Sequence, residues 1–211
     1  MSKKLVILDL DNTCICAKEK DEIEDVAYPE FYSGENQYVD LFEDENDPKS
    51  NILYRIYPRP GLQAFLDQLF NQYQVAVWTA ADIDYALFVI KHFITCGKPE
   101  RQLKFIMWHD HCEFSSNHTE DEQAKQLTLL SLPLDKPLYD IDDMVIIDDN
   151  ELVLRQIYDS IDSQYFDVGK KYATRDTFLP HTCLDKIKSH FNNKKRLEQK
   201  RILLERIHYL R

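Results

Sequence analysis

Residues 5–13 have the sequence LVILDLDNT, in which four apolar residues run directly into two closely spaced aspartates. A continuous run of Val, Ile and Leu is typical of a strand that is buried on both faces, as in a parallel sheet. Open α/β sheets bind their ligands at the carboxyl ends of such strands. If the strand continues, its two-residue period places Asp9 and Asp11 on the same side. The stretch therefore predicts an α/β fold whose chemistry begins at Asp9.

Two neighbouring carboxylates repel one another unless a cation or a shared proton lies between them. Mg²⁺, which prefers oxygen ligands, is the simplest cation for this role. An Asp/Asn turn that merely follows a strand is the alternative interpretation, and this short stretch alone leaves both open.

Composition limits the class of protein. A chain of 211 residues can form one α/β domain with a large core and an insertion. A formal net charge of -11 disfavours nucleic acid and anionic membranes as partners. No apolar run approaches membrane-spanning length, and the N-terminus lacks the core of a signal peptide. The 5 cysteines are scattered, which indicates free thiols in a reducing intracellular compartment, with cytoplasm and nucleus both open.

Residues 18–50 are strongly acidic, with aromatic residues between the charges. We interpret this segment as an acidic insertion after the first strand, and we favour a solvated, partly ordered surface loop over a partner-binding arm. Residues 52–57 then predict a short strand.

The pattern of an apolar strand that ends in polar residues occurs twice more. Residues 75–78 (VAVW) lead into Thr79, and residues 144–147 (MVII) lead into Asp148 and Asp149. Helical patterns lie between the strands, and Asp82 is a suitable N-cap for one of them. Strands that alternate with helices imply a parallel sheet with right-handed crossovers. If the three strands are neighbours, one edge of the sheet collects the following residues, with Lys136 nearby: Asp9, Asp11, Thr79, Asp148 and Asp149.

The remaining pattern is weaker. We expect a strand at residues 105–108, a short helix near 123–130, a helix at 151–158 and a strand at 165–168. The cluster His109, Asp110, His111 and Cys112 raises the hypothesis of a zinc site, which we do not favour because these positions cannot all converge on one ion.

The collected residues have a coherent chemistry. Carboxylates from two strands can hold Mg²⁺, while the cation and a Lys ammonium neutralise a phosphate and the Thr hydroxyl hydrogen-bonds to it. One carboxylate can then attack phosphorus and form an aspartyl-phosphate, and a second can protonate the leaving oxygen and activate water.

Four motifs in order, DLDNT, WTA, a Lys ahead of an acidic pair, and IIDDN, resemble those of the haloacid dehalogenase (HAD) superfamily. YPRPGLQAFLDQL, YQVAVWTAADIDYA and MWHDHCEF resemble one branch of it, the phosphatases of the RNA polymerase II carboxyl-terminal domain (the NLI-interacting-factor-like domain). The resemblance implies an α/β, HAD-like Rossmannoid fold with a central parallel sheet flanked by helices and a small insertion between the second and third motifs. It implies a phosphatase domain over residues 1–191, and the charge pattern predicts a basic C-terminal helix at 192–211 after it.

The resemblance also implies roles for individual residues. Asp9 resembles the nucleophile, and Asp11 the general acid/base whose backbone carbonyl also meets the metal. Thr79, Ala80 and Lys136 correspond to phosphate-binding positions. Asp148 and Asp149 match the metal-binding pair; the second is often Asn in this branch, which leaves the direct ligand open.

Three departures put the polymerase tail in question as the substrate. The branch often has Arg where His109 or Asp110 stands, its Lys-Asp-Leu is here Lys136-Pro137-Leu138, and the acidic insertion is longer than expected. Arg59 matches an Arg with an expected structural role.

We therefore expect a Mg²⁺-dependent phosphoserine/phosphothreonine phosphatase that acts on a phosphopeptide or phosphoprotein, with the polymerase tail as a candidate substrate. The alternatives are a phosphatase for a small molecule or a nucleic-acid end, and a non-catalytic phosphoprotein-binding module. The oligomeric state stays open.

Overall fold

The computed structural model describes residues 4–23, 38–44, 47, 49–59, 61–116, 125–131, 139–154, 160–162 and 180–193. The predicted strand at 165–168 and the basic segment from residue 194 onward lie outside these residues, as does Lys136. Within the described ranges, no helix combines the length and the apolar character needed to span a membrane.

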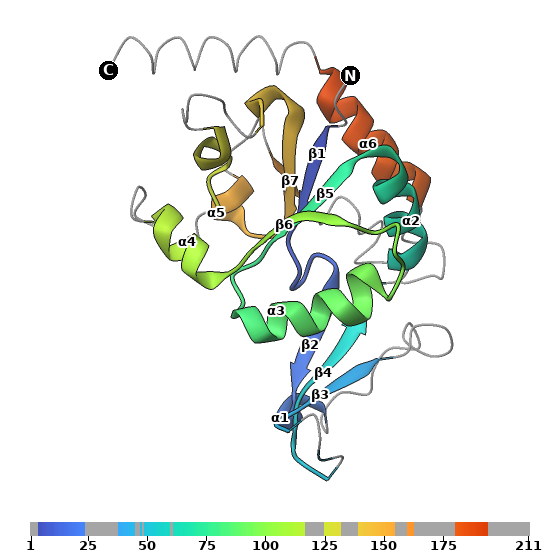
Figure 1. Ribbon diagram of the computed structural model, residues 1–211, viewed down its shortest axis with the longest axis vertical. Helices are drawn as coiled ribbons and strands as arrows, with labels where there is room; N and C mark the ends of the chain where they lie inside the picture. Colours follow the sequence, from blue (N-terminus) through green and yellow to red (C-terminus); the bar gives the residue numbers. More distant parts are fainter. Residues whose placement is uncertain are drawn as a thin grey trace.

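A five-stranded parallel sheet forms the centre of the fold, and the first strand occupies its middle (Figure 1). The order across the sheet is β6 (Leu103–Met107), β5 (Gln74–Trp78), β1 (Leu5–Leu8), β7 (Met144–Asp148) and β8 (Ser160–Asp162). Leu5 pairs with Gln74 on one side and with Met144 on the other. The three strands predicted from apolar runs are therefore neighbours, and the prediction of a central parallel sheet is confirmed.

Helices cover both faces of this sheet (Figure 1). Val6 and Leu8 of β1 face a core formed with α2 (Leu62–Gln72), α3 (Ile83–Val89) and α6 (Pro180–Asn192). Because side chains alternate along a strand, Leu5 and Ile7 face the opposite core. That second core includes side chains from α4 (His109–Ser116), the 3-10 helix η3 (Leu127–Ser131) and α5 (Glu151–Leu154). All four β1 side chains are buried, as the continuous apolar run predicts.

The helix after β5 is capped as expected, since the Asp82 side chain accepts a hydrogen bond of 2.9 Å from the Tyr85 amide. The same helix continues beyond α3 as a π-helix, η2 (Ile90–Thr95). In the weakly periodic region, the short helix expected near 123–130 is the 3-10 helix η3, and a second 3-10 helix, η4 (Ile141–Asp143), precedes β7. The short strand β8 is an element that the sequence pattern did not predict.

A second, antiparallel sheet lies beyond α3 (Figure 1). Its order is β2 (Ile15–Glu19), β4 (Ile52–Pro58) and β3 (Val39–Phe42), and the short helix α1 (Lys20–Ile23) follows β2. The strand at 52–57 is confirmed. The interpretation of residues 18–50 as a solvated loop missed β2 and β3, because these half-buried strands are stabilised by pairing with β4 rather than by an apolar run of their own.

Candidate active site

The site lies at the carboxyl ends of β1, β5 and β7. Hydrogen bonds of the sheet continue one residue past β1 and β5, to Asp9 and Thr79. The Asp9 amide donates to the Ile147 carbonyl at 3.0 Å, and the Thr79 amide donates to the Met107 carbonyl at 3.0 Å. These bonds fix the backbone of the two predicted site residues. Asp9 and Thr79 are both buried.

The loop after β1 turns sharply. Asn12 has a φ of 56°, a left-handed conformation that Asn tolerates better than most residues. The amides of Thr13, Cys14 and Ile15 all donate to the Leu10 carbonyl. Asp11, which lies within this turn, is half-buried.

Arg59 holds the outer side of this turn. Its Nε donates to the Thr13 carbonyl and its Nη2 to the Asn12 carbonyl, each at 2.6 Å. The Arg59 amide also donates to the Cys14 carbonyl at 2.9 Å. Arg59 thus holds the backbone of the turn, which fits the structural role expected from the family resemblance.

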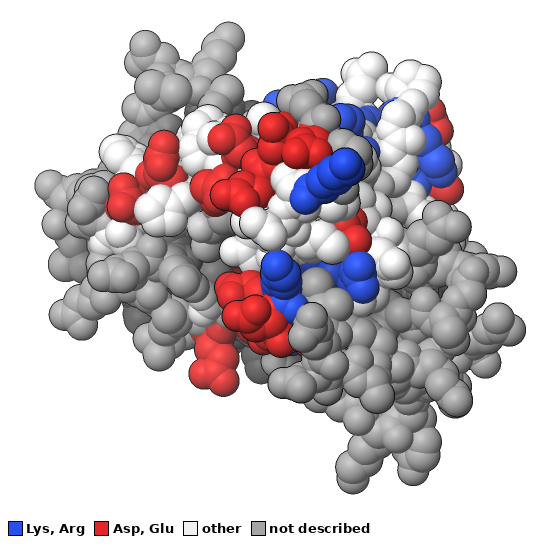
Figure 2. All heavy atoms as spheres, turned by 90° about the horizontal axis from the view of Figure 1, so that it is seen from below, with Lys and Arg blue, Asp and Glu red and all other residues white. Residues whose placement is uncertain are grey.

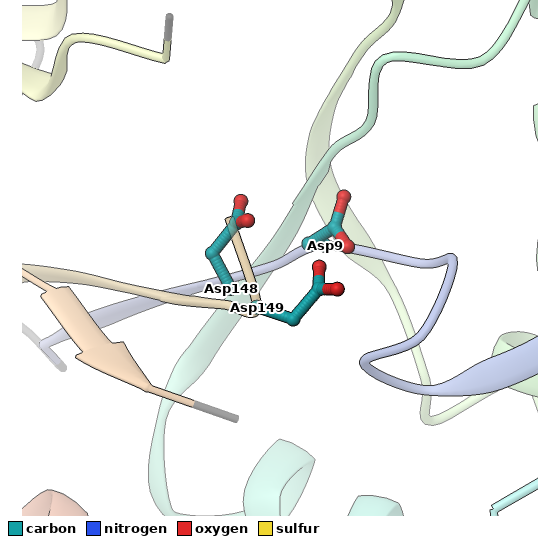
Figure 3. Close-up of side chains that lie close together, drawn as sticks. All are labelled: Asp9, Asp148 and Asp149. Carbon is teal, nitrogen blue, oxygen red and sulfur yellow. The ribbon is translucent and has the colours of Figure 1, made fainter. Parts of the chain in front are cut away.

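Three carboxylates converge at the centre of the site (Figure 3). Asp9, Asp148 and Asp149 each offer an oxygen, and these oxygens lie within 4.8 Å of one another. Asp9 and Asp148 are buried and Asp149 is half-buried. A compact set of carboxylate oxygens fits the ligand preference of Mg²⁺, so these residues are suited to hold that ion.

Lys125 supplies a positive charge to the same place. Its Nζ lies 2.5 Å from Asp9 Oδ1 and 2.8 Å from Asp148 Oδ2, and only 3% of its side chain is exposed. The other oxygen of Asp148 accepts a hydrogen bond of 2.9 Å from the Asn150 amide. Both oxygens of Asp148 are thus engaged within the protein.

The sequence analysis missed Lys125 and placed Lys136 in this role. Lys125 lies two residues before Leu127, which is fully buried in the core. The intervening Gln126 donates a hydrogen bond of 3.0 Å from its amide to Ser115 Oγ. The sequence Lys125-Gln126-Leu127 could have indicated this lysine. It matches the Lys-x-Leu pattern and lacks the proline that follows Lys136. The role predicted for Lys136 is not tested, since that residue is outside the described part of the chain.

Burial and neighbouring charges both shift the pKa values of these groups. Burial raises the pKa of Asp9, and the nearby Lys125 only partly offsets this. Burial, together with the charge of Asp9, raises the pKa of Asp148 to about 6. The two carboxylates raise the pKa of Lys125 despite its burial, so this side chain stays protonated.

Asp11 lies outside the group of three convergent carboxylates and has a separate partner. Tyr85 of α3 donates a hydrogen bond of 2.7 Å from its hydroxyl to Asp11 Oδ1. Burial raises the pKa of Asp11, and this hydrogen bond acts against the rise. The sequence pattern did not single out Tyr85.

The loop after β5 contributes Thr79 and Ala80. Thr79 Oγ1 accepts a hydrogen bond of 3.2 Å from the Ala81 amide, and the Thr79 carbonyl accepts one of 3.5 Å from Cys112 Sγ. Ala80 is half-buried beside Thr79. His109 begins α4 next to this loop, with its amide donating to the Ala81 carbonyl at 2.9 Å.

Comparison with known proteins identifies the family of the chain. A family model described as NLI interacting factor-like phosphatase matches residues 4–196, which confirms the resemblance seen in the sequence. CTD phosphatase-like protein 355R of Invertebrate iridescent virus 3 is 39% identical over 120 residues, covering 55% of this chain and 60% of the viral protein. The protein of the same name from Invertebrate iridescent virus 6 is 36% identical over 151 residues, which cover 71% of this chain and 78% of the viral protein.

Two solved structures share the fold. One is a variant of the fission yeast RNA polymerase II CTD phosphatase Fcp1 bound to beryllium fluoride, with a TM-score of 0.51 and 21% identity. It aligns with 96% of this chain and 56% of that one. A second structure, of Fcp1, described as an essential RNA polymerase II CTD phosphatase, has a TM-score of 0.50 and 21% identity. The alignment covers 96% of this chain and 54% of that one.

Proposed function

Because the chain belongs to the NLI interacting factor-like phosphatase family, we propose that it is a Mg²⁺-dependent phosphatase for phosphoserine and phosphothreonine in proteins. The observation that carries the proposal is the position of Asp9. Its carboxylate contacts the ammonium of Lys125 and converges with the carboxylates of Asp148 and Asp149, at the carboxyl end of the central strand. A phosphate and a nucleophile can meet there with their negative charges compensated.

The residues divide the reaction into two steps. Asp9 attacks phosphorus, the bond from phosphorus to the serine or threonine oxygen breaks, and Asp11 gives its proton to that oxygen. Asp11 then takes a proton from water as the water attacks the aspartyl-phosphate, which releases phosphate and restores Asp9. Lys125 fixes Asp9 Oδ1 throughout and offsets the charge of the transferred group. Thr79 and Ala80 hold the phosphate from the β5 side.

We assign Asp9 and Asp149 as side-chain ligands of Mg²⁺, together with the backbone carbonyl of Asp11. Asp148 holds Lys125 and the Asn150 amide instead, since both of its oxygens are already engaged. When bound, the ion compensates phosphate charge and orients the phosphoryl group. The chemistry of the proposed donor set, two carboxylates and one backbone carbonyl, supports Mg²⁺ over softer metals.

A phosphoprotein is the proposed substrate class, and the carboxyl-terminal tail of RNA polymerase II is the candidate within it. The viral relatives and the solved structures carry names that refer to this tail. The chain covers only 60% of the first of these relatives, so the assignment is a proposal for this chain. On the face seen in Figure 2, clusters of acidic side chains lie beside Lys and Arg side chains. The formal net charge of -11 does not favour nucleic acid as the substrate.

Phosphate release tests the proposal. The substrates are a phosphoserine peptide with the repeat of the polymerase tail and p-nitrophenyl phosphate, each with Mg²⁺ and with chelator. We expect turnover of both substrates, loss in chelator, and loss in Asp9→Asn. Turnover of the small ester alone would keep the mechanism and reject the substrate, and phosphopeptide binding without release from either substrate would indicate a binding module.

A further inference from the structure

We propose that Tyr85 is a positioning residue for Asp11, and that it makes proton transfer to the leaving oxygen depend on contacts with the second sheet. The inference rests on the proposed function, because it concerns the acid/base residue of that reaction. It adds a residue to the site that neither the sequence pattern nor the convergent carboxylates identify.

The first observation is the contact itself. The Tyr85 hydroxyl donates to Asp11 Oδ1 at 2.7 Å, which is a short bond to an ionisable group. It leaves Asp11 Oδ2 as the oxygen that can exchange a proton with substrate and water. Burial and the neighbouring Asp11 also raise the pKa of Tyr85, so Tyr85 keeps the proton that it donates.

The second observation is how firmly Tyr85 is placed on the side of the five-stranded sheet. It stands in the first turn of α3, where its amide donates to the capping Asp82 side chain at 2.9 Å. The preceding residues are the loop that carries Thr79 and Ala80. The single segment of residues 79–85 therefore supplies both the proposed phosphate-binding positions and the residue that supports Asp11.

The third observation is the support from the second sheet. The Tyr54 ring of β4 meets the Tyr85 ring edge-to-face, with centroids 5.5 Å apart and an interplanar angle of 71°. This is a favourable aromatic geometry, and it limits rotation of the Tyr85 ring. Tyr54 is paired on both sides within its sheet, with Glu19 of β2 and Leu41 of β3. The position of Asp11 thus depends on residues from both sheets.

A positioning role for Tyr85 makes a selective prediction about leaving groups. A serine oxygen leaves as an unstable alkoxide unless it receives a proton, whereas p-nitrophenolate leaves as a stable anion. Misplacement of Asp11 should therefore slow phosphoserine cleavage much more than p-nitrophenyl phosphate cleavage. A general loss of folding or of phosphate binding would slow both substrates alike.

The experiment compares Tyr85→Phe with wild type on a phosphoserine peptide and on p-nitrophenyl phosphate, both with Mg²⁺. The substitution removes only the hydroxyl and keeps the ring against Tyr54. We expect kcat/KM to fall about tenfold or more for the phosphopeptide and less than about threefold for the small ester, with the loss in kcat rather than in KM. Tyr73→Phe, at a ring that stacks on Phe191 away from the site, is the matched control and should change neither value.

Equal losses on both substrates, or no loss, would overturn the role of Tyr85. A second measurement uses the Asp11→Asn background in single-turnover reactions, where Tyr85→Phe should have no further effect; an additive loss there would show that Tyr85 does not act through Asp11. If wild type releases no phosphate from either substrate, the proposed function fails, and that result is distinct from an insensitive Tyr85→Phe variant.

Discussion

The Nζ of Lys125 lies 2.5 Å from Asp9 Oδ1, although the two residues are 116 positions apart in the chain. Nothing in the pattern around Lys125 resembles the strand ends that supply the other site residues. The contact joins the proposed nucleophile to the segment just before η3.

Replacement of this lysine is the first prediction. Lys125→Met keeps most of the side-chain volume and removes the charge that compensates Asp9 and the phosphate. We expect kcat/KM for p-nitrophenyl phosphate to fall about 100-fold or more at saturating Mg²⁺. Lys136→Met is the matched control and should stay within about twofold of wild type. The reverse pattern would return the role to Lys136, as the sequence analysis predicted.

The acidic pair at the end of β7, Asp148 and Asp149, should separate metal binding from contact with Lys125. Asp149→Ala removes a proposed ligand, so we expect the half-saturating Mg²⁺ concentration for phosphate release to rise about tenfold or more. Asp149→Asn keeps a carbonyl oxygen and should raise the half-saturating Mg²⁺ concentration less than Asp149→Ala does. Asp148→Asn changes a residue that contacts Lys125 rather than the ion, so it should shift the half-saturating Mg²⁺ concentration less than Asp149→Ala does. A larger Mg²⁺ shift in Asp148→Asn than in Asp149→Ala would contradict this assignment of the ligands.

The buried Asp148 predicts how stability without metal depends on pH. Its pKa is about 6 in the folded protein against an ordinary value of 3.8, so the fold favours the protonated form. Its contribution to the free energy of unfolding is therefore largest below pH 4 and is lost as the pH rises through 6, by about 3 kcal/mol.

Thermal unfolding in chelator, measured on either side of pH 6, tests this prediction. The stability of wild type relative to Asp148→Asn should fall as the pH rises, and stabilisation by Mg²⁺ should be larger above pH 6 than below it. A difference between the two proteins that does not change with pH would contradict the burial of an ionisable Asp148.

Arg59 should affect the rate through the loop that carries Asp11. Arg59→Met removes two hydrogen bonds to the carbonyls of Asn12 and Thr13, so we expect a loss of about 1–3 kcal/mol in the free energy of unfolding. We also expect kcat for p-nitrophenyl phosphate to fall more than KM rises.

Arg59→Lys should recover only part of this loss, because one ammonium cannot reproduce the fork of a guanidinium. Arg55→Met is the control, since Arg55 pairs with Asp40 at 2.7 Å within the second sheet. It should lower stability while leaving kcat for the small ester unchanged. Full activity in Arg59→Met would show that the turn holds without this side chain.

The sequence predicted best where burial on both faces of the sheet dictates residue type. The runs that became β1, β5 and β7 are continuously apolar, so their ends and the polar residues that follow could be located. Asp9, Thr79 and Asp148 were found for this reason.

Contacts set by tertiary packing could not be found in the same way. Lys125 lies just before η3 and not at the end of any strand that the structure describes, and the Tyr85 hydroxyl contacts Asp11 across 74 positions of sequence. In the second sheet, β3 alternates charged and apolar residues such as Asp40 and Leu41, and it depends on β4 for pairing. Local periodicity contains no information about such partners.

The central place of β1 has a consequence for how the protein folds. Leu5 pairs with Gln74 on one side and with Met144 on the other, so the earliest strand in the sequence has no partner until distant segments arrive. Such non-local pairing raises contact order and slows folding. During synthesis, Asp9 would wait for the second half of the protein, and the catalytic centre would be among the last features to assemble.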